Sequence, residues 1–311
     1  MASRARVLFI GDSISGAQIL DSILEIADLV AIAGAGESDK RSATRRGIPF
    51  LPAVSLRQPA GVEWVSAVAP VLIVNFNSLT ILPPSILAAP QLGAFNLHPG
   101  RLPEYAGMWA WQWAIIENQP TTAATLHEMI AGVDTGDIVG EAPVAIDAFD
   151  TGLTLYLKLL RSGARLVIQM LPDMIAGKLE RRRQPLNDRR YFSSAPPFGG
   201  IIDPRWDAQR IERFVRALSY RPLRCPSAPP QILTSIGAIE IAGARVADTS
   251  GESPGMLLKI SGDGILIACG RASICIQHAY LEGTQTPAAT LPDKLGVRTG
   301  NLLALSPSAG Q

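Results

Sequence analysis

Cysteine is scarce in this chain of 311 residues, which has only Cys225, Cys269 and Cys275. Three is an odd number, and their spacing does not match that of a metal site. The sequence therefore predicts reduced core residues of a cytoplasmic protein rather than a disulfide framework.

Excess charge is also lacking, because 28 basic residues against 27 acidic ones leave a formal net charge of +1. This balance gives no global electrostatic reason to expect nucleic acid or an anionic membrane as a partner. No apolar run reaches the roughly 18 residues that a bilayer-spanning helix needs. The apolar N-terminal run is also too short for the core of a signal peptide. We therefore expect no membrane partner; the sequence does not indicate the oligomeric state.

Short apolar runs alternate with helical patterns in the first third of the chain. Strands are expected at 7–10, 29–33, 48–50, 71–76 and 92–98, with a helix at 15–27, a polar loop with a broken helix after residue 33, and a short proline-led helix after residue 81. This order predicts an α/β fold with a Rossmann-like, doubly wound, mostly parallel sheet.

The rest of the chain predicts two further parts. A helix at 108–117, strands at 122–129 and 138–146, and a long helix at 153–176, kinked or restarted at Pro172, complete a catalytic domain at 1–188. A segment rich in proline, glycine and arginine predicts a linker at 189–205. An amphipathic helix at 207–218, followed by short alternating strands, predicts a small OB-like β-barrel domain at 206–311.

Three polar residues form the candidate site. Asn96 and His98 end the strand at 92–98, and a period of two places them on one face. Open α/β sheets keep their chemistry at strand ends. Asp134 stands in a glycine-flanked turn about thirty residues later. An amide donor, an imidazole and a carboxylate could together polarise a carbonyl group and manage a proton.

Two shorter motifs compete with this site. VLFIGDSIS is similar to the opening block of GDS-type serine esterases, in which Ser13 would be the nucleophile. Such an enzyme also needs an oxyanion-hole Asn block and a late DxxH pair, and neither occurs, so we favour a turn or helix-cap role for Ser13. The turns at Gly11 and Gly34 lack the further residues of a phosphate or dinucleotide motif.

The stretches FNLHPGRLPEYAG (95–107) and LHEMIAGVDTGDI (126–138) resemble the 10-formyltetrahydrofolate-dependent formyltransferases. This family includes methionyl-tRNA formyltransferase and the N-formyltransferases of nucleotide amino sugars. The helix at 207–218 and the strands after it resemble the C-terminal barrel of the tRNA enzyme. The resemblance implies catalytic roles for Asn96, His98 and Asp134, and 10-formyltetrahydrofolate as cosubstrate without a metal. It places the folate contacts at Leu82, Pro83, Gly100, Arg101, Leu102 and Pro103.

The family chemistry implies that a primary amine attacks the formyl carbon directly. Asn96 would donate a hydrogen bond to the developing oxyanion, and a protonated His98 would share this task. Asp134 would raise the pKa of His98 and help to relay the proton lost by the amine.

The acceptor is less closely defined than the donor. The family loop reads close to SLLPxYRG, and here Gly100 replaces the serine and Ala106 replaces the arginine. The first loop is also shorter and less basic than that of the tRNA enzyme. We therefore expect a small-molecule or carrier-bound amine, such as an amino sugar, an ornithine-like side chain or an aminoacyl group, with tRNA as the alternative.

Aromatic residues follow the folate loop. Met108, Trp109 and Trp111 could form a wall beside the acceptor, although core packing is the competing interpretation. A non-catalytic folate-binding protein also remains an alternative to an enzyme.

Overall fold

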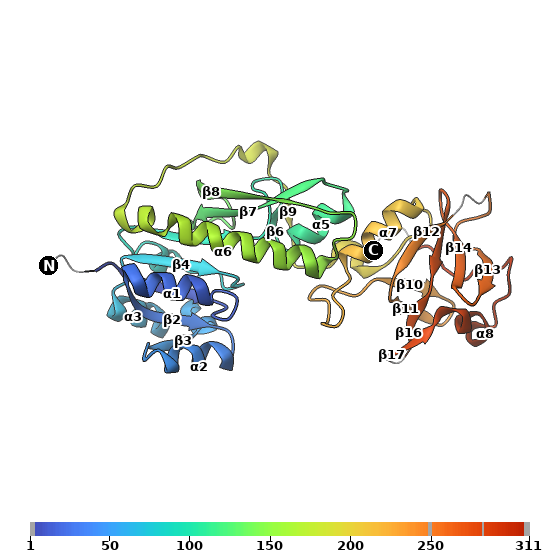
Figure 1. Ribbon diagram of the computed structural model, residues 1–311, viewed down its shortest axis with the longest axis horizontal. Helices are drawn as coiled ribbons and strands as arrows, with labels where there is room; N and C mark the ends of the chain where they lie inside the picture. The colour runs from blue at the N-terminus through green and yellow to red at the C-terminus, as the bar shows by residue number, and fades with distance from the viewer. Residues whose placement is uncertain (1–3, 248–250, 282, 308–311) are drawn as a thin grey trace. The chain divides into compact units, whose positions relative to one another are not determined.

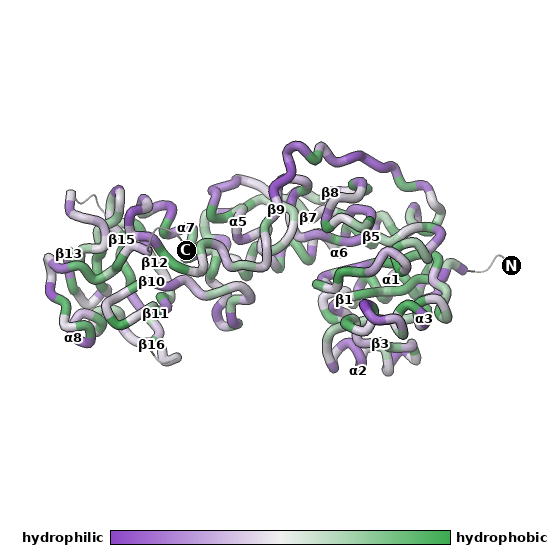
Figure 2. The backbone as a smooth tube through the Cα atoms, turned by 180° about the vertical axis from the view of Figure 1, so that it is seen from behind, coloured by the Kyte–Doolittle hydropathy of each residue, from purple (hydrophilic) through white to green (hydrophobic). Residues whose placement is uncertain are grey.

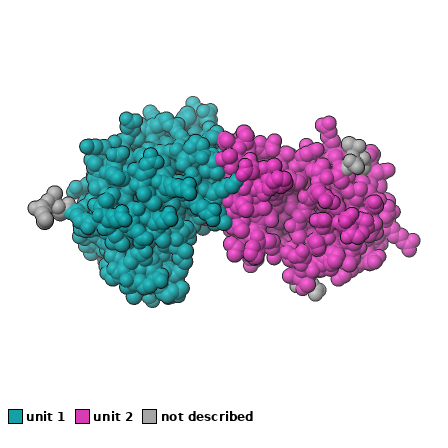
Figure 3. All heavy atoms as spheres, in the orientation of Figure 1, with its two compact units in different colours: residues 1–107, 122–144, 157–191 teal, residues 108–121, 145–156, 192–311 magenta. Residues whose placement is uncertain are grey.

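The computed structural model describes residues 4–247, 251–281 and 283–307 (Figure 1). The chain forms two compact units (Figure 3). Unit 1 comprises 1–107, 122–144 and 157–191, and unit 2 comprises 108–121, 145–156 and 192–311. The predicted division into a catalytic domain at 1–188, a linker at 189–205 and a barrel domain at 206–311 stays a prediction. No helix in the described ranges has both the length and the apolar character needed to cross a membrane.

Unit 1 is built on a seven-stranded sheet with the order β3-β2-β1-β4-β5-β7-β8. Its strands are β1 (Arg6–Gly11), β2 (Asp28–Gly34), β3 (Phe50–Pro52), β4 (Leu72–Phe76), β5 (Ala94–His98), β7 (Thr121–Glu128) and β8 (Ile138–Ala145). The first five pair in parallel, and β7 runs antiparallel to β5. This arrangement confirms the predicted Rossmann-like, mostly parallel sheet.

Helices and short 3-10 segments connect these strands or follow the last of them. They are α1 (Ala17–Ile26), α2 (Glu37–Arg45), η1 (Ala53–Arg57), α3 (Pro59–Val68), α4 (Pro84–Leu87), α6 (Gly152–Ala176) and η2 (Leu186–Asp188). The sequence pattern did not reveal α3, and α2 is one helix rather than a broken one. Helix α6 continues through Pro172 without a restart, and the alternative expectation of a kink at Pro172 stays a prediction.

Helix α6 lies close to one face of β5. A Cβ atom added to Gly163 would lie only 2.0 Å from Leu97 Cδ2, so a larger residue would not fit there. Side chains alternate along a strand, so Asn96 and His98 point to the opposite face. The segment after α6, at 180–190, is the hydrophilic stretch that runs towards β9 (Tyr191–Phe192) in Figure 2.

In the described ranges, unit 2 contains the helices α5, α7 and α8 and two antiparallel sheets. One sheet has the order β10 (Gln231–Thr234), β11 (Gly237–Ile241), β16 (His278–Leu281) and β17 (Thr284–Pro287); the other has the order β12 (Ala244–Ala247), β15 (Ser273–Ile276), β14 (Gly264–Ala268) and β13 (Leu257–Ser261). Its longer helices are α5 (Ala110–Ile116) and α7 (Ala208–Ala217), and the shorter elements are η3 (Pro197–Gly200), η4 (Ala288–Thr290) and α8 (Leu291–Leu295). The predicted strand-rich C-terminal domain is confirmed.

Helix α7 begins close to where the sequence predicts a helix at 207–218. Asp207 caps α7, because its Oδ1 accepts a 2.7 Å hydrogen bond from the Arg210 backbone N–H.

The three cysteines are free thiols, but only Cys269 is buried. The prediction that all three lie in the core was therefore wrong for Cys225 and Cys275, which are half-buried.

Candidate active site

The site begins with three polar side chains on one face of the sheet. Asn96 of β5 lies opposite Asn75 of β4 and opposite His127 of β7. Residues opposite one another on neighbouring strands project from the same face. The sheet register therefore forms a row that runs across three strands.

Hydrogen bonds fix the orientation of this row. His127 Nδ1 lies 2.9 Å from the Glu128 carbonyl oxygen, which can only accept, so Nδ1 carries the hydrogen. In the neutral ring, His127 Nε2 then accepts the 3.0 Å hydrogen bond from Asn96 Nδ2. At the other end, Asn75 Nδ2 donates to Asn96 Oδ1 at 2.9 Å. The Asn96 amide is therefore held from both sides.

The carboxylate of Asp134 lies next to this row. Its Oδ2 accepts a 2.8 Å hydrogen bond from the Gly107 backbone N–H and lies 3.6 Å from His98 Nδ1. Its Oδ1 lies 3.4 Å from His127 Nε2. The structure thus brings together the predicted residues Asn96, His98 and Asp134, with His127 between the first and the last.

The turn that carries Asp134 is held from outside. Asp134 has a positive φ of 54°, in the left-handed region. Gln184 Nε2 donates to the backbone oxygens of Asp134 and Gly136, at 3.0 and 2.6 Å. A Cβ atom at Gly136 would lie 1.9 Å from the Glu128 oxygen, so only glycine fits. The glycine-flanked pattern therefore reflects a real packing constraint.

The charge states of the pair differ from the sequence expectation. Burial lowers the pKa of His98 below its ordinary value of 6.5 and outweighs the nearby Asp134 carboxylate, which acts to raise it. Burial acts to raise the pKa of Asp134, but His98, His127 and the Gly107 N–H outweigh it and hold this pKa far below its ordinary range. The predicted effect of Asp134, which is to raise the pKa of His98, is therefore confirmed, but burial makes the net direction downward and does not favour the expected protonated ring. The site combines a neutral ring with an ionised carboxylate.

The ring orientation of His98 adds to this picture. His98 Nε2 lies 2.7 Å from the Tyr105 carbonyl oxygen and so carries the ring hydrogen. In the neutral ring, Nδ1 then presents a lone pair towards Asp134. Together the two groups form a place where a proton can be taken up.

The predicted folate-binding residues fall into two groups. Leu82 is buried in an apolar cluster of unit 1 with neighbours such as Ile86, and Pro83 precedes α4. Gly100 belongs to the loop after β5, where its carbonyl oxygen accepts a 2.7 Å hydrogen bond from Thr125 Oγ1. Contact between either group and the cosubstrate remains a prediction.

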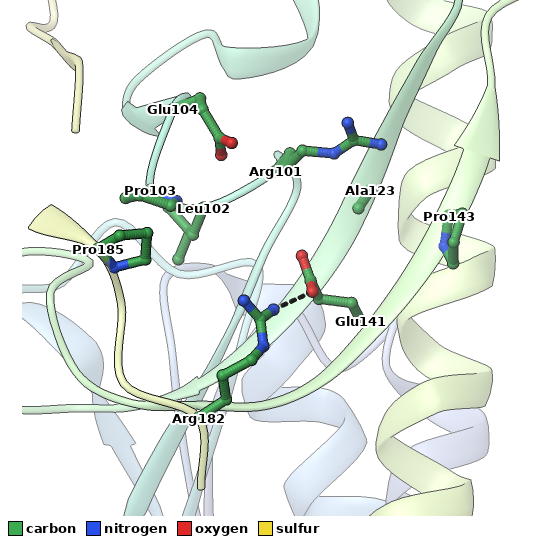
Figure 4. Close-up of a pocket in the computed structure, with 9 residues that line it drawn as sticks. All are labelled: Arg101, Leu102, Pro103, Glu104, Ala123, Glu141, Pro143, Arg182 and Pro185. Carbon is green, nitrogen blue, oxygen red and sulfur yellow. Dashed lines mark hydrogen bonds and ion pairs between the residues drawn. The ribbon is translucent and has the colours of Figure 1, made fainter. Parts of the chain in front are cut away.

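The rest of this loop lines a cavity of about 280 Å³ (Figure 4). Its lining residues are Arg101, Leu102, Pro103, Glu104, Ala123, Glu141, Pro143, Arg182 and Pro185. Arg182 and Glu141 form an ion pair in this cavity. Ala123 precedes Thr125 by two residues on β7, and Thr125 lies opposite His98. The cavity therefore opens on the same sheet face as Asn96 and His98.

The predicted acceptor wall belongs to unit 2. Trp109 donates through Nε1 to the Ser194 carbonyl oxygen at 3.1 Å, and Trp111 donates to the Tyr220 hydroxyl. Both indole rings are buried, and the Met108 backbone N–H donates to the Phe192 oxygen at 2.8 Å. These contacts give the indole rings a packing role, and contact with an acceptor remains a prediction.

Ser13 is not placed as a nucleophile. It is 2% exposed, and its hydroxyl donates to Asp39 Oδ1 at 2.7 Å. Asp39 Oδ2 also accepts from the backbone N–H groups of Ala35 and Gly36, at the start of α2. The favoured turn role for Ser13 agrees with this geometry, and a carboxylate of the chain itself closes the glycine-containing turn after β2.

His127 was not among the site residues predicted from the sequence. It lies in the quoted motif, but only the antiparallel register of β5 and β7 reveals that it faces Asn96. No group of three or more His, Cys, Asp or Glu residues in the described ranges is arranged to hold a metal ion.

A half-buried amide donor beside an imidazole–carboxylate pair, at the carboxyl end of a sheet strand, suits an enzyme that catalyses attack on a carbonyl group. Comparison with known proteins shows the family to which the chain belongs. A family model described as formyl transferase matches residues 33–171, and one for the C-terminal domain of formyl transferases matches residues 199–290.

One relative shows the family directly. The chain is 30% identical over 244 residues to methionyl-tRNA formyltransferase of Geobacter sulfurreducens, which covers 78% of this chain and 75% of that protein. The chain therefore belongs to the 10-formyltetrahydrofolate-dependent formyltransferase family. It is an enzyme that transfers a formyl group.

Solved structures show the same fold at lower identity. An N-formyltransferase from Helicobacter canadensis, in complex with folinic acid and dTDP-3-aminofucose, matches with a TM-score of 0.65 at 17% identity, over 88% of this chain and 99% of that chain. HypX from Aquifex aeolicus, in complex with tetrahydrofolic acid, matches with a TM-score of 0.59 at 17% identity, over 96% of this chain and 49% of that chain.

Proposed function

We propose that this enzyme transfers the formyl group of 10-formyltetrahydrofolate to the primary amine of a small-molecule or carrier-bound acceptor. The observation that carries the proposal is the Asn96 amide beside the neutral His98 and the ionised Asp134. The amine nitrogen bonds to the formyl carbon, and the bond between that carbon and N10 of the cosubstrate breaks. The proton lost by the amine passes through the site to N10, so that tetrahydrofolate leaves as the second product.

Asn96 supplies the electrophilic assistance. Its Nδ2 carries two hydrogens, and the contacts within the described residues account for one of them, at His127 Nε2. The other is available to the formyl oxygen, on which negative charge develops during attack. A preorganised donor in a buried site stabilises such charge more strongly than water does.

His98 and Asp134 manage the proton. The attacking amine must lose a proton. Asp134 Oδ2 lies 3.6 Å from His98 Nδ1, so a carboxylate and the lone pair of the neutral ring lie side by side where they can accept this proton. Protonation of His98 removes this lone pair. The rate should therefore fall as the pH drops through the lowered pKa of His98, below 6.5.

The acceptor class follows from the loop and from the charge of the chain. Ala106, which stands where the family pattern has arginine, is fully buried in an apolar cluster with Leu102 and Ile138. The positive charge that the family pattern has at this position is therefore absent from this chain. With a net charge of +1, this favours a small or carrier-bound amine. The structural match to an enzyme complexed with an aminofucose nucleotide supports the same class.

One observation favours tRNA as a second candidate. The exposed side of α2 carries a shallow hollow lined by Glu37, Lys40, Arg41, Thr44 and Arg45. Arg46, by contrast, is engaged with Asp21 at 3.0 Å. Three cations on one helix could contact a phosphate backbone, and the relative from Geobacter acts on methionyl-tRNA by its name.

A formyl-transfer screen separates these acceptors. Tetrahydrofolate release would be followed with a nucleotide amino sugar, an ornithine derivative, an aminoacyl carrier and initiator methionyl-tRNA. We expect turnover with at least one small or carrier-bound amine. Turnover with tRNA alone, with affinity that falls steeply as salt rises, would overturn the acceptor assignment. A Lys40→Ala, Arg41→Ala double variant should lose activity only if tRNA is the acceptor.

A further inference from the structure

Asn75 is a polar residue in a strand that is buried along its whole length. Every residue of β4 is buried, and Asn75 itself is 3% exposed. The apolar pattern of this run gives no role to an amide. A buried amide is costly unless its hydrogen-bonding groups are satisfied, so its presence in the sheet needs a reason.

The hydrogen bonds of Asn75 point to the catalytic row. Its Nδ2 donates to Asn96 Oδ1 at 2.9 Å, across the β4–β5 register. Its Oδ1 is buried and has no hydrogen-bond partner among the described residues. An amide placed for stability would have both groups satisfied, as most buried polar groups do. Here one end bonds the proposed oxyanion donor and the other end bonds nothing described.

These contacts fix which way the Asn96 side-chain amide is turned. A side-chain amide can turn by 180° and exchange its oxygen with its nitrogen. At one end His127 Nε2 accepts from the Asn96 nitrogen, because Nδ1 is committed to the Glu128 oxygen. At the other end Asn75 supplies the donor that the Asn96 oxygen requires. In the turned orientation, Asn96 Oδ1 would face the lone pair of His127 Nε2, and Asn96 Nδ2 would face Asn75 Nδ2. Neither pair of atoms could then form a hydrogen bond.

We propose that Asn75 is a positioning residue for the formyl-transfer reaction. It holds the Asn96 amide with its nitrogen towards His127 and leaves the second N–H aimed at the formyl oxygen. This inference rests on the proposed function, in which Asn96 donates to that oxygen. Asn75 touches no reacting atom and acts only through Asn96.

The kinetic test uses Asn75→Leu, which keeps a side chain of similar shape and removes the donor. We expect kcat to fall about tenfold, the factor that corresponds to one neutral hydrogen bond. Both KM values should stay within about twofold, because the lost interaction acts on the transition state. Thermal stability should be unchanged or higher, since an unsatisfied amide leaves the core. Asn75→Ala serves the same purpose if the larger side chain does not fit.

A matched control separates this effect from the removal of any buried polar group. Thr122 lies on β7, is 1% exposed, and has no hydrogen-bond partner for its hydroxyl within the ranges described. By strand alternation it points to the face opposite His127. Thr122→Val should therefore leave kcat unchanged. In addition, Asn75→Leu combined with Asn96→Ala should be no slower than Asn96→Ala alone, because Asn75 acts only through that amide.

A second measurement does not depend on turnover. With ¹⁵N-asparagine labelling, the Asn96 side-chain amide signals are identified by their loss in Asn96→Ala. We expect Asn75→Leu to shift these signals and to speed their hydrogen exchange about tenfold or more. If the wild type transfers no formyl group to any amine, the proposed function fails while this measurement still tests the hydrogen bond. Unchanged Asn96 signals, or kcat within twofold of the wild type in both Asn75 variants, would overturn the positioning role.

Discussion

Two largely buried polar networks, one in each unit, show how differently this chain uses hydrogen bonds. The Asn96 network of unit 1 joins Asn75, Asn96, His98, His127 and Asp134. The indole network of unit 2 joins Trp111, Gln112 and Ser227 around the Tyr220 hydroxyl and the Gln112 amide. Most side chains of both networks are buried.

The indole network consists of neutral groups that satisfy one another. Trp111 and Gln112 donate to Tyr220, and Ser227 Oγ donates to Gln112 Oε1 at 2.9 Å. Burial raises the pKa of Tyr220, so its hydroxyl stays protonated. Such an arrangement stabilises the fold and has no group poised to change its charge.

The Asn96 network holds an ionised carboxylate, the His98 ring with its lowered pKa and a buried amide oxygen of Asn75 that lacks a partner among the described residues. Buried ionic groups are often replaceable by apolar side chains without loss of stability. We therefore expect that unit 1 retains these groups for chemistry and that unit 2 retains its groups for packing. Breaking the two networks should therefore have opposite consequences.

The largest expected effect is on catalysis. Asn96→Ala and Asp134→Ala should each lower kcat on the order of 100-fold or more, because each removes a group that acts on the reacting atoms. The melting temperature, followed by circular dichroism, should change little by comparison. A purified variant of either residue with near-normal turnover would contradict the assignment of the site.

The opposite pattern is expected in the indole network. Tyr220→Phe leaves the buried Trp111 donor without its acceptor and leaves Gln112 Nε2 with only Cys225 Sγ as an acceptor. It should cost about 1–3 kcal/mol in the free energy of unfolding. At a temperature where the variant stays folded, kcat should remain near the wild-type value. Tyr191→Phe is the matched control, because Tyr191 is 52% exposed. Urea unfolding measures both, and equal stability of the two variants would disprove the role of the network.

A smaller effect is expected from the support of the Asp134 turn. Gln184→Leu removes the donor to two backbone oxygens and should lower kcat about tenfold through a misplaced carboxylate. Gln209→Leu, on the exposed side of α7, should have no effect. Steady-state kinetics checks this. An unchanged kcat in Gln184→Leu would show that the Asp134 turn keeps its conformation without the hydrogen bonds from Gln184.

The smallest effect is a pH dependence. The folded-state pKa of His98 lies below 6.5, so just below pH 6.5 the unfolded chain binds a proton that the folded chain does not. The free energy of unfolding should therefore fall as the pH drops through this window. NMR titration should place His98 below 6.5, and lower still in Asp134→Asn, because the carboxylate that raises this pKa is removed. A midpoint above 6.5 would contradict the neutral ring.

The sequence predicted the parts of this site that depend on local pattern. Strand alternation put Asn96 and His98 on one face, and the glycine-flanked turn marked Asp134. Asn75 and His127 were out of reach because their roles come from the pairing of β4, β5 and β7, which no local pattern encodes. Residue 75 also interrupts an apolar run, where the pattern has no place for a functional amide.

The pKa of His98 could not be predicted for a related reason. Its direction depends on the balance between burial and one nearby charge, and the sequence shows the charge without the burial. In the fold, the alternation of strands and helices was sufficient for the parallel sheet. It was not sufficient for α3, which starts at Pro59 in a segment that carries no strong helical period.

The assistance that Asn96 gives to formyl transfer can be measured with an isotope label. The wild type and Asn96→Ala each receive 10-formyltetrahydrofolate labelled with ¹³C at the formyl carbon, together with the best amine from the screen. Mass spectrometry of the acceptor then reports where the label goes. We expect ¹³C-formyl on the amine nitrogen, formed on the order of 100-fold more slowly by Asn96→Ala. Labelled formate without a formylated amine, or equal rates for the two proteins, would contradict it.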